Sequence, residues 1–360
     1  MKIGIFGLPL TGKTTIFSLL TNKPYDNAYK NEAEERVAIV RDERVDKLTQ
    51  LYKPKKTIYT TLNFIDIPSY DPQADRKEKN RILQTIQNVD ALILVVRAFK
   101  SPSIPWPERA ETPLKQLDLL RTEMIVRDLE IIENKLERLE EQSKKKKLTS
   151  EEKALVALLN KLKETLENNE FIAKTELSEL EKKLVSPFAF FTLKPVVVVV
   201  NIDEEQMKSN DYPMKKDLIE ICRRENFAYM EICGKIEADL VEIESTDEKE
   251  LFMKEFGIEK SGIDRLSKVV YDHVGLITFF TVGEDEVRAW TITKGTTMKK
   301  AAGKIHSDLE RGFIKAEVMN YADLIRFGNE TEVKKNGLWR LAGKDEIVKD
   351  GDILTIRSNA

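Results

Sequence analysis

Apolar and polar positions along this chain follow two different patterns, one typical of strands and one typical of helices. Short apolar runs typical of strands cover residues 2–6, 57–67, 89–99, 195–200 and 227–232. The runs at 89–99 and 195–200 are apolar on both faces, as in strands buried inside a parallel sheet. Residues 15–20 follow the first run with helical spacing. The pattern predicts an α/β domain with a mostly parallel sheet.

The stretch from residue 114 to 186 lacks proline and glycine and has a different period. Apolar residues recur there at alternating spacings of four and three, as in a heptad seam: Ile125, Leu129, Ile132, Leu136, Leu139, and then Leu155, Leu159, Leu162, Leu166. A charged break at residues 143–147 separates the two series, and Thr149 with Glu152 predicts a capping box that starts the second helix. We expect an inserted antiparallel helical hairpin, which is either an arm that contacts a partner or a structural insertion.

The chain changes character again from residue 276, where glycines become frequent and the apolar runs shorten. One helix is expected near residues 298–309. This pattern predicts a separate small domain with ubiquitin-like β-grasp topology. The predicted organisation is an α/β domain of residues 1–113 and 188–276, a coiled-coil insertion of residues 114–187, and a β-grasp domain of residues 277–360.

The most specific motif lies at the start of the chain. Residues 7–14 read G-x-x-x-x-G-K-T between an expected strand and an expected helix, which is a complete phosphate-binding loop (P-loop). Backbone N–H groups of such a loop surround phosphates, and the helix N-terminus favours their negative charge. Lys13 adds a positive charge, and the Thr14 hydroxyl can bind Mg²⁺. The motif predicts a nucleoside triphosphate site.

Asp66 ends the apolar run at 57–67, where P-loop proteins place the acidic residue that holds Mg²⁺. Lys13, Thr14 and Asp66 are therefore the candidate catalytic residues, with Thr14 and Asp66 as metal ligands. The expected D-x-x-G is altered, because Ser69 replaces the glycine and Tyr70 stands where some GTPases carry a water-orienting glutamine.

Residues 22–48 occupy the place of a first switch segment but contain no threonine or serine. Residues 22 to about 36 are expected to be irregular. Three glutamates there, Glu32, Glu34 and Glu35, are interpreted as part of a solvated acidic loop, with approach to a metal as the alternative.

A candidate base-binding stretch follows the run at 195–200. Asn201-Ile202-Asp203-Glu204 stands where GTPases carry N-K-x-D, with isoleucine in place of lysine and glutamate in place of aspartate. A carboxylate displaced by one methylene fits the guanine edge less well, and sites of this kind discriminate strongly. Residues 227–235, ending in Cys233, Gly234 and Lys235, form the last strand and a loop placed to back the base.

Composition narrows the class of protein. The 360 residues carry a formal net charge of −3, which does not mark the whole chain as a nucleic-acid binder. The chain has no apolar run of about 18 residues, so no membrane span is expected. Two cysteines and no signal-peptide pattern fit a cytoplasmic protein.

These motifs together resemble the YchF / Obg-like ATPase family of translation-factor-class P-loop proteins. The resemblance covers essentially the whole chain and includes residues 42–44, 201–204 and 236–238. It is strongest in residues 279–290, 301–308, 312–314 and 337–340, which are similar to that family's TGS domain.

The resemblance implies a P-loop NTPase that binds ATP at least as well as GTP and associates with the ribosome or ribosomal RNA through the TGS domain and the arm. It also implies a role for Ile202 in packing on the base, and for six consecutive residues in holding phosphates: Leu10, Thr11, Gly12, Lys13, Thr14, Thr15. This chain departs from the family at Ser69, in the missing switch threonine, and in having no histidine before His273.

From the sequence we therefore expect an ATP-preferring protein with slow Mg²⁺-dependent hydrolysis that regulates translation. Two alternatives stay open. One is a GTP-dependent switch of the translation-factor type. The other is a scaffold that binds nucleotide without hydrolysing it. The sequence leaves the oligomeric state open.

Overall fold

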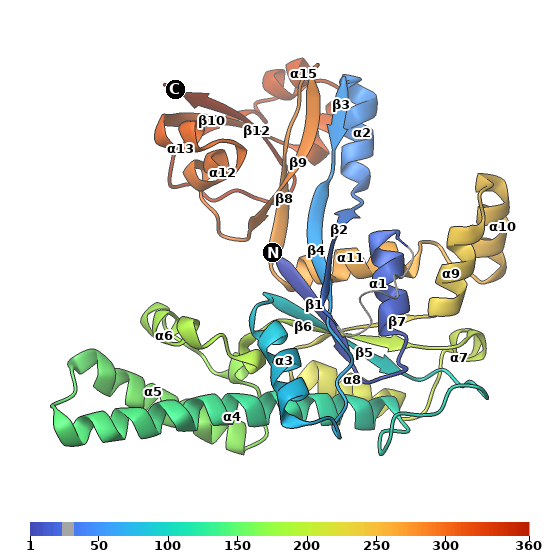
Figure 1. Ribbon diagram of the computed structural model, residues 1–360. Helices are drawn as coiled ribbons and strands as arrows, with labels where there is room; N and C mark the ends of the chain where they lie inside the picture. Colours follow the sequence, from blue (N-terminus) through green and yellow to red (C-terminus); the bar gives the residue numbers. More distant parts are fainter. Residues whose placement is uncertain (24–31, 360) are drawn as a thin grey trace. The chain divides into compact units, whose positions relative to one another are not determined.

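The structure is a computed structural model that describes residues 1–23 and 32–359. By its internal contacts the chain divides into two compact units, which we describe separately. The first contains residues 1–36 and 63–266, and the second contains residues 37–62 and 267–360. Figure 1 labels the elements of both units. The domain boundaries expected from the sequence stay a prediction.

The first unit is built on a six-stranded sheet with strand order β2-β4-β1-β5-β6-β7. The pairings of β1 with β4 and β5, and of β6 with β5 and β7, are all parallel, which confirms the predicted sheet. The strands are β1 (Lys2–Gly7), β2 (Glu34–Val40), β4 (Thr60–Asp66), β5 (Ala91–Arg97), β6 (Val196–Asn201) and β7 (Ala228–Ile232). Because the strands are parallel, their carboxyl ends meet along one edge, where loops can converge on a ligand.

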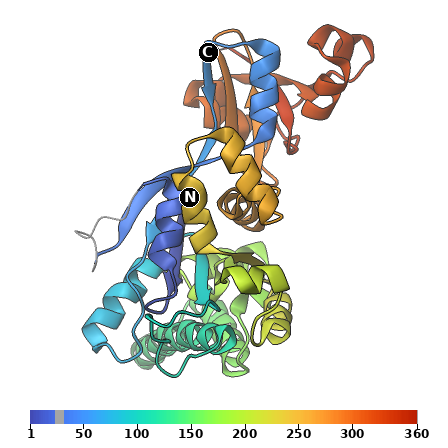
Figure 2. The ribbon, with the colours of Figure 1, turned by 90° about the vertical axis from the view of Figure 1, so that its right-hand side faces the viewer.

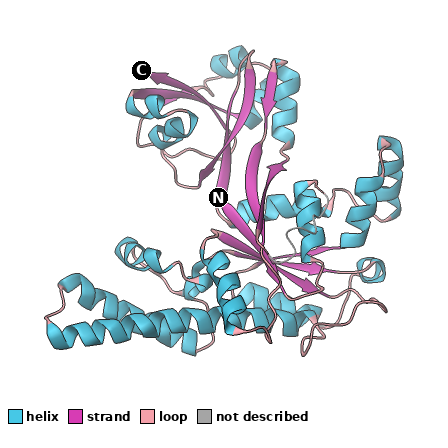
Figure 3. Ribbon diagram, in the orientation of Figure 1, coloured by secondary structure: helices cyan, strands magenta, loops and turns pink. Residues whose placement is uncertain are grey.

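The first unit also contains helices, which Figure 3 distinguishes from the strands. They are α1 (Lys13–Thr21), α3 (Arg76–Gln87), α4 (Pro113–Lys145), α5 (Ser150–Glu167), α6 (Glu179–Val185), α7 (Glu204–Ser209), α8 (Lys215–Arg224), α9 (Gly234–Glu242) and α10 (Thr246–Glu255). The boundary between the two units falls within α11 (Gly262–His273). Three single 3₁₀ turns, η2 (Ile172–Lys174), η3 (Ser186–Phe188) and η4 (Phe191–Leu193), precede β6. No helix among the described residues is both long enough and apolar enough to cross a membrane.

The predicted hairpin is present as α4 and α5, which extend side by side away from the sheet (Figure 1). Its seam residues Ile125, Ile132 and Leu139 on α4, and Leu159, Leu162 and Leu166 on α5, are buried. The capping box of Thr149 and Glu152 is confirmed. The predicted break at residues 143–147 begins too early, because α4 continues to Lys145. We call α4 and α5 the arm.

The second unit contains its own six-stranded sheet, with strand order β11-β10-β12-β8-β9-β3. Its strands are β3 (Lys56–Ile58), β8 (Leu276–Thr281), β9 (Glu286–Thr293), β10 (Phe313–Asn320), β11 (Arg340–Ala342) and β12 (Asp352–Ser358). Its helices are α2 (Glu43–Tyr52), α12 (Met298–Ile305), α13 (Ser307–Arg311), α14 (Tyr321–Phe327) and α15 (Glu330–Lys335). The single helix expected near residues 298–309 is therefore two helices, and two more follow. Figure 2 gives a second view of these elements.

The run at residues 57–67, predicted as one strand, is two strands in different sheets. β3 pairs in parallel with β9, whereas β4 pairs in parallel with β1. Strand propensity describes a fit to a half-buried pleated surface and does not identify the partner strand. The apolar pattern was therefore sufficient to predict β structure, but not the switch from one sheet to the other.

Candidate functional site

The P-loop joins β1 to α1 and uses left-handed backbone at two positions. Leu10 has φ 63° and Gly12 has φ 85°. A Cβ atom added to Gly7 would lie 2.6 Å from the Val95 carbonyl oxygen, and one added to Gly12 would lie 2.2 Å from Asn201 Nδ2. Both glycines are therefore required by close approach of neighbouring groups. The Thr11 hydroxyl donates to the Leu8 carbonyl (3.0 Å), which fixes the middle of the loop.

Lys13 and Asp66 form a buried ion pair beside this loop. The Lys13 ammonium donates to Asp66 Oδ1, and both side chains are almost fully buried. Burial lowers the pKa of Lys13, and the negative charge of Asp66 opposes that shift. The structure therefore brings together two of the three candidate catalytic residues, which are 53 positions apart in the sequence.

The first turn of α1 contains Lys13, Thr14 and Thr15 and no acidic residue. Thr14 is partly exposed and Thr15 is exposed. A helix N-terminus without acidic side chains keeps its positive end available to an anion. Of the six predicted phosphate-binding residues, Leu10, Thr11 and Gly12 thus lie in the loop, and Lys13, Thr14 and Thr15 form the first turn of α1.

The base-binding candidates meet the P-loop through Asn201, the last residue of β6. Asn201 Nδ2 donates to the Thr11 carbonyl (3.1 Å), and Asn201 Oδ1 accepts from the Gly234 N–H (3.1 Å). All three groups are buried. One amide side chain therefore bonds to the phosphate loop on one side and to the loop before α9 on the other.

The remaining base-site candidates differ in exposure. Ile202 and Cys233 are buried within the apolar core of the first unit, and burial raises the pKa of the Cys233 thiol. Glu204, the first residue of α7, pairs with Lys235 Nζ at 2.7 Å on the surface. The Asn201–Glu204 and Cys233–Lys235 segments therefore lie together, with a polar outer side and an apolar inner side. The role of Ile202 in packing on a base stays a prediction.

Two supporting residues were missed by sequence reasoning. Asp203 accepts from the Lys100 N–H (3.1 Å) and forms a capping box with Gln206. Gln206 Nε2 donates to the Ala98 carbonyl (2.8 Å), so these residues bond α7 to the chain that leaves β5. The spacing Asp203-x-x-Gln206 is a capping-box signal that could have identified them.

The positions expected to sense the γ-phosphate are arranged differently. Tyr70 is buried and packs edge-on against the Phe6 ring at a centroid distance of 5.9 Å. Burial, together with the negative charge of Glu123, raises the pKa of its hydroxyl. Tyr70 is thus a core residue. Ser69 beside it is exposed.

The predicted switch segment is partly a strand. Residues 24–31 of it lie outside the described residues. Glu34 and Glu35 belong to β2 and pair with Arg36 and Lys2, so the expectation of irregular structure up to residue 36 is wrong from Glu34 onward. Alternating burial along β2 explains the strand. Within residues 1–23 and 32–359, no group of three or more acidic, histidine or cysteine side chains is arranged to hold a metal.

Comparisons with known proteins identify similar families and relatives. The family model described as "50S ribosome-binding GTPase" matches residues 2–175, and the YchF-GTPase_C model, described as "Protein of unknown function (DUF933)", matches residues 276–359. The chain is 37% identical to the "Ribosome-binding ATPase YchF" of Bacillus subtilis, with 100% of this chain and 99% of the relative covered. It is 35% identical to the protein of the same name from Haemophilus influenzae, with 99% of each covered.

A solved structure extends the likeness to the fold. The structure of the Schizosaccharomyces pombe YchF GTPase superposes with a TM-score of 0.87 at 30% sequence identity, and it covers 99% of this chain and 97% of the other. Full-length identity to relatives, matching family models and a matching fold lead to one conclusion. This chain belongs to the YchF family of P-loop proteins.

Proposed function

We propose that this chain binds a purine nucleoside triphosphate, ATP in preference to GTP, and hydrolyses it slowly to the diphosphate. The observation that carries the proposal is the Asn201 side chain, which bonds to the P-loop at Thr11 and to the opposite loop at Gly234. This bond pair holds phosphate-binding and base-binding candidates at one edge of the sheet. The names of the relatives, which call them ATPases, support the same activity.

Mg²⁺ is the cofactor that the donor set fits. Thr14 offers a hydroxyl and Asp66 a carboxylate, and hard cations such as Mg²⁺ prefer oxygen ligands. Asp66 is already held beside the P-loop by its bond to Lys13. When bound, the ion would neutralise phosphate charge.

Hydrolysis would join a water oxygen to the γ-phosphorus and break the bond to the β-phosphate oxygen. Lys13 would stabilise the negative charge that develops on the phosphate oxygens. Tyr70 is buried in the core, so it is not placed to substitute for a water-orienting glutamine. For this reason we propose a low intrinsic rate and a partner that completes the site.

The preference for ATP is proposed from Glu204, which replaces the guanine-binding aspartate and lies beside Lys235. The test is calorimetric titration of the wild type, Glu204→Asp and the control Glu205→Asp with ATP and with GTP, each with Mg²⁺. We expect the wild type to bind ATP more tightly, Glu204→Asp to shift towards GTP, and Glu205→Asp to behave as the wild type. Tighter GTP binding by the wild type would instead favour the switch GTPase.

The burial of Tyr70 also favours a second candidate, a scaffold stabilised by nucleotide without turnover. Single-turnover assays with purified ribosomes separate the two functions. Phosphate release that ribosomes accelerate supports the ATPase. Tight binding without release, and equal protection from protease by di- and triphosphate, would support the scaffold.

We further propose that the protein is cytoplasmic and regulates translation by associating with the ribosome. The relatives named as ribosome-binding support this, as does the arm, whose seam residues have coiled-coil spacing. The domains would be residues 1–113 with 188–276, the insertion 114–187, and the TGS domain 277–360. Cosedimentation of the full chain with ribosomes, with and without ATP, tests the association.

A further inference from the structure

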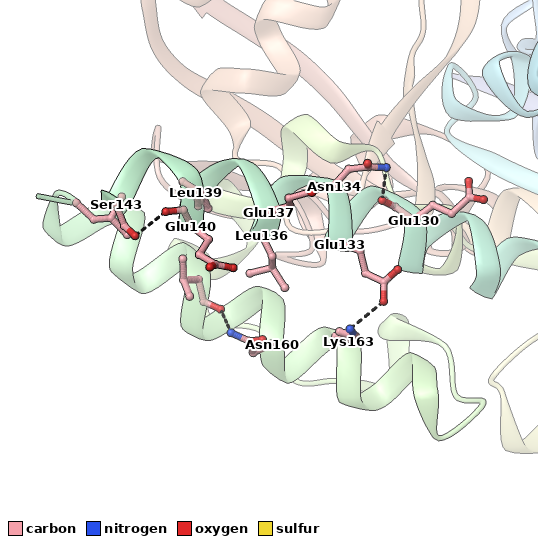
Figure 4. A pocket seen from close by; sticks show the side chains of 12 residues that line it. Glu130, Glu133, Asn134, Leu136, Glu137, Leu139, Glu140, Ser143, Asn160 and Lys163 are labelled. Carbon is pink, nitrogen blue, oxygen red and sulfur yellow. Dashed lines mark hydrogen bonds and ion pairs between the residues drawn. The ribbon is translucent and has the colours of Figure 1, made fainter. Parts of the chain in front are cut away.

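The outer part of the arm contains a groove between its two helices that the arm itself does not fill. The groove has a volume of about 720 Å³ and is lined by α4, α5 and Leu148 in the turn that joins them (Figure 4). Nearer the sheet, seam residues such as Ile132, Leu159 and Leu162 are fully buried. At the groove, Leu136, Leu148 and Val156 remain partly exposed. Leu139 of the seam also lines the groove and is buried, so the two helices leave Leu136 and the apolar side chains beside the seam partly uncovered at this end.

The rim of the groove is strongly acidic on the α4 side. Glu130, Glu133, Glu137 and Glu140 line it, and Lys163 of α5 is the single basic residue among the lining side chains. The glutamates are spaced by three and four residues, so they form one stripe of about 15 Å along α4. Figure 4 shows Glu133 reaching towards Lys163 across the groove.

Three of these glutamates have partners that a ligand could replace at small cost. Glu130 pairs with Arg127, Glu133 with Lys163 and Glu140 with Lys144, and every pair has at least one partner that is more than half exposed. Exposed pairs of this kind contribute little to stability. Glu137 makes no ion pair within the described part of the chain. The stripe is therefore available to cationic groups.

From this arrangement we propose that the groove binds a basic amphipathic helix of a partner protein. Its apolar face would cover Leu136, Leu148 and Val156, and its lysine or arginine residues would meet the glutamate stripe. Docking of this kind adds a third helix to a two-helix seam. An RNA backbone would instead meet four carboxylates. The inference rests on the proposed ribosome association, within which it assigns the arm groove to protein and not to RNA.

The test uses the full chain and a labelled synthetic peptide of leucine and lysine with helical amphipathic spacing. We expect saturable binding that Glu137→Lys weakens about tenfold, because a charge at the stripe is reversed. The matched control is Glu141→Lys, which makes the same change on the same helix at an exposed residue that does not line the groove. It is expected to bind as the wild type. Circular dichroism confirms that both variants fold.

Equal loss in both variants, or no binding by the wild type, would overturn the proposal. Binding of labelled protein-free ribosomal RNA, measured without the peptide, that Glu137→Lys changes and Glu141→Lys does not would overturn it in favour of a nucleic-acid surface. Cosedimentation of the wild type with ribosomes is measured separately. Peptide binding without cosedimentation would refute the ribosome association but support the groove as a binding site. Cosedimentation that Glu137→Lys leaves unchanged would refute the groove as the ribosome contact.

Discussion

The candidate site and the outer arm hold their polar side chains in opposite ways. In the site, Lys13 bonds to Asp66 and Asn201 bonds to Thr11. The partners are 53 and 190 positions apart in the sequence, and these groups are buried. In the outer arm, pairs such as Glu140 with Lys144 are one helical turn apart and exposed. Buried groups lose more when a partner is removed than exposed groups do. Equivalent substitutions should therefore have large effects in the site and small effects in the arm.

Lys13→Met tests the largest expected effect. We expect the hydrolysis rate to fall by at least about 100-fold, because the charge that stabilises the transferred phosphate is lost. The free energy of unfolding should also fall by about 3–5 kcal/mol, because Asp66 loses its buried partner. Phosphate-release assays and urea unfolding measure the two effects.

The double variant Lys13→Met/Asp66→Asn separates these two effects. It removes both charges, so the free energy of unfolding should largely return to the wild-type value, while hydrolysis stays at least about 100-fold slower than in the wild type. A single variant that retains the wild-type rate would show that Lys13 does not act on the phosphate.

Asn201→Ala tests the bond pair that joins the two loops, and Asn160→Ala makes the same change in the arm. In the site, the Thr11 carbonyl and the Gly234 N–H would be left buried without this partner, at a cost of about 2–4 kcal/mol in total. Asn160 is exposed, and its side chain bonds, among the described residues, only to the Val156 carbonyl one turn away (2.9 Å). Its loss should therefore stay within about 0.5 kcal/mol. Chemical unfolding compares the variants, and similar losses would contradict the contrast between the two regions.

This contrast also explains what could be predicted from the sequence. The P-loop and Asp66 follow a fixed spacing, and the arm follows a heptad period, so both could be located from local pattern. The pairing of β3 with β9 could not, because it depends on a strand more than 200 residues away. Asp128 was missed for a similar reason. It reads as an ordinary polar position between Ile125 and Leu129, and its burial becomes visible only when η4 packs against α4.

Asp128 is an exception to this contrast, because it lies in the arm but is buried and bonds to residues that are distant in the sequence, as the site residues do. Its carboxylate accepts from the Phe191 and Thr192 N–H groups (2.9 and 2.8 Å) and from the Thr192 hydroxyl (2.7 Å), and it is fully buried. Burial raises the pKa of Asp128 to about 6, against the opposing effect of these hydrogen bonds. The inner end of α4 is thus bonded to the segment that leads into β6.

A carboxyl group whose pKa is higher in the folded protein than in the unfolded chain stabilises the folded protein more at low pH than at high pH. The folded protein binds the Asp128 proton more tightly than the unfolded chain, so this residue's contribution declines as pH rises from about 4 through about 6. Asp128→Asn removes that dependence. We expect the stability of the variant relative to the wild type to rise by about 2–3 kcal/mol between pH 4 and pH 7. Urea unfolding across this range measures it, and a constant difference would refute the titration.

Thr149→Ala tests the smallest effect, at the tip of the arm. The Thr149 hydroxyl accepts from the Glu152 N–H (3.1 Å), and the Glu152 carboxylate accepts from the Thr149 N–H (2.8 Å). Removing the hydroxyl should cost about 1 kcal/mol. Ser150→Ala, the control, alters the next residue and should cost less, because no comparable cap is lost. Because the cap is local and exposed, nucleotide affinity should not change in either variant. A loss of several kcal/mol, or weaker ATP binding in calorimetry, would mean that the tip of the arm is coupled to the site.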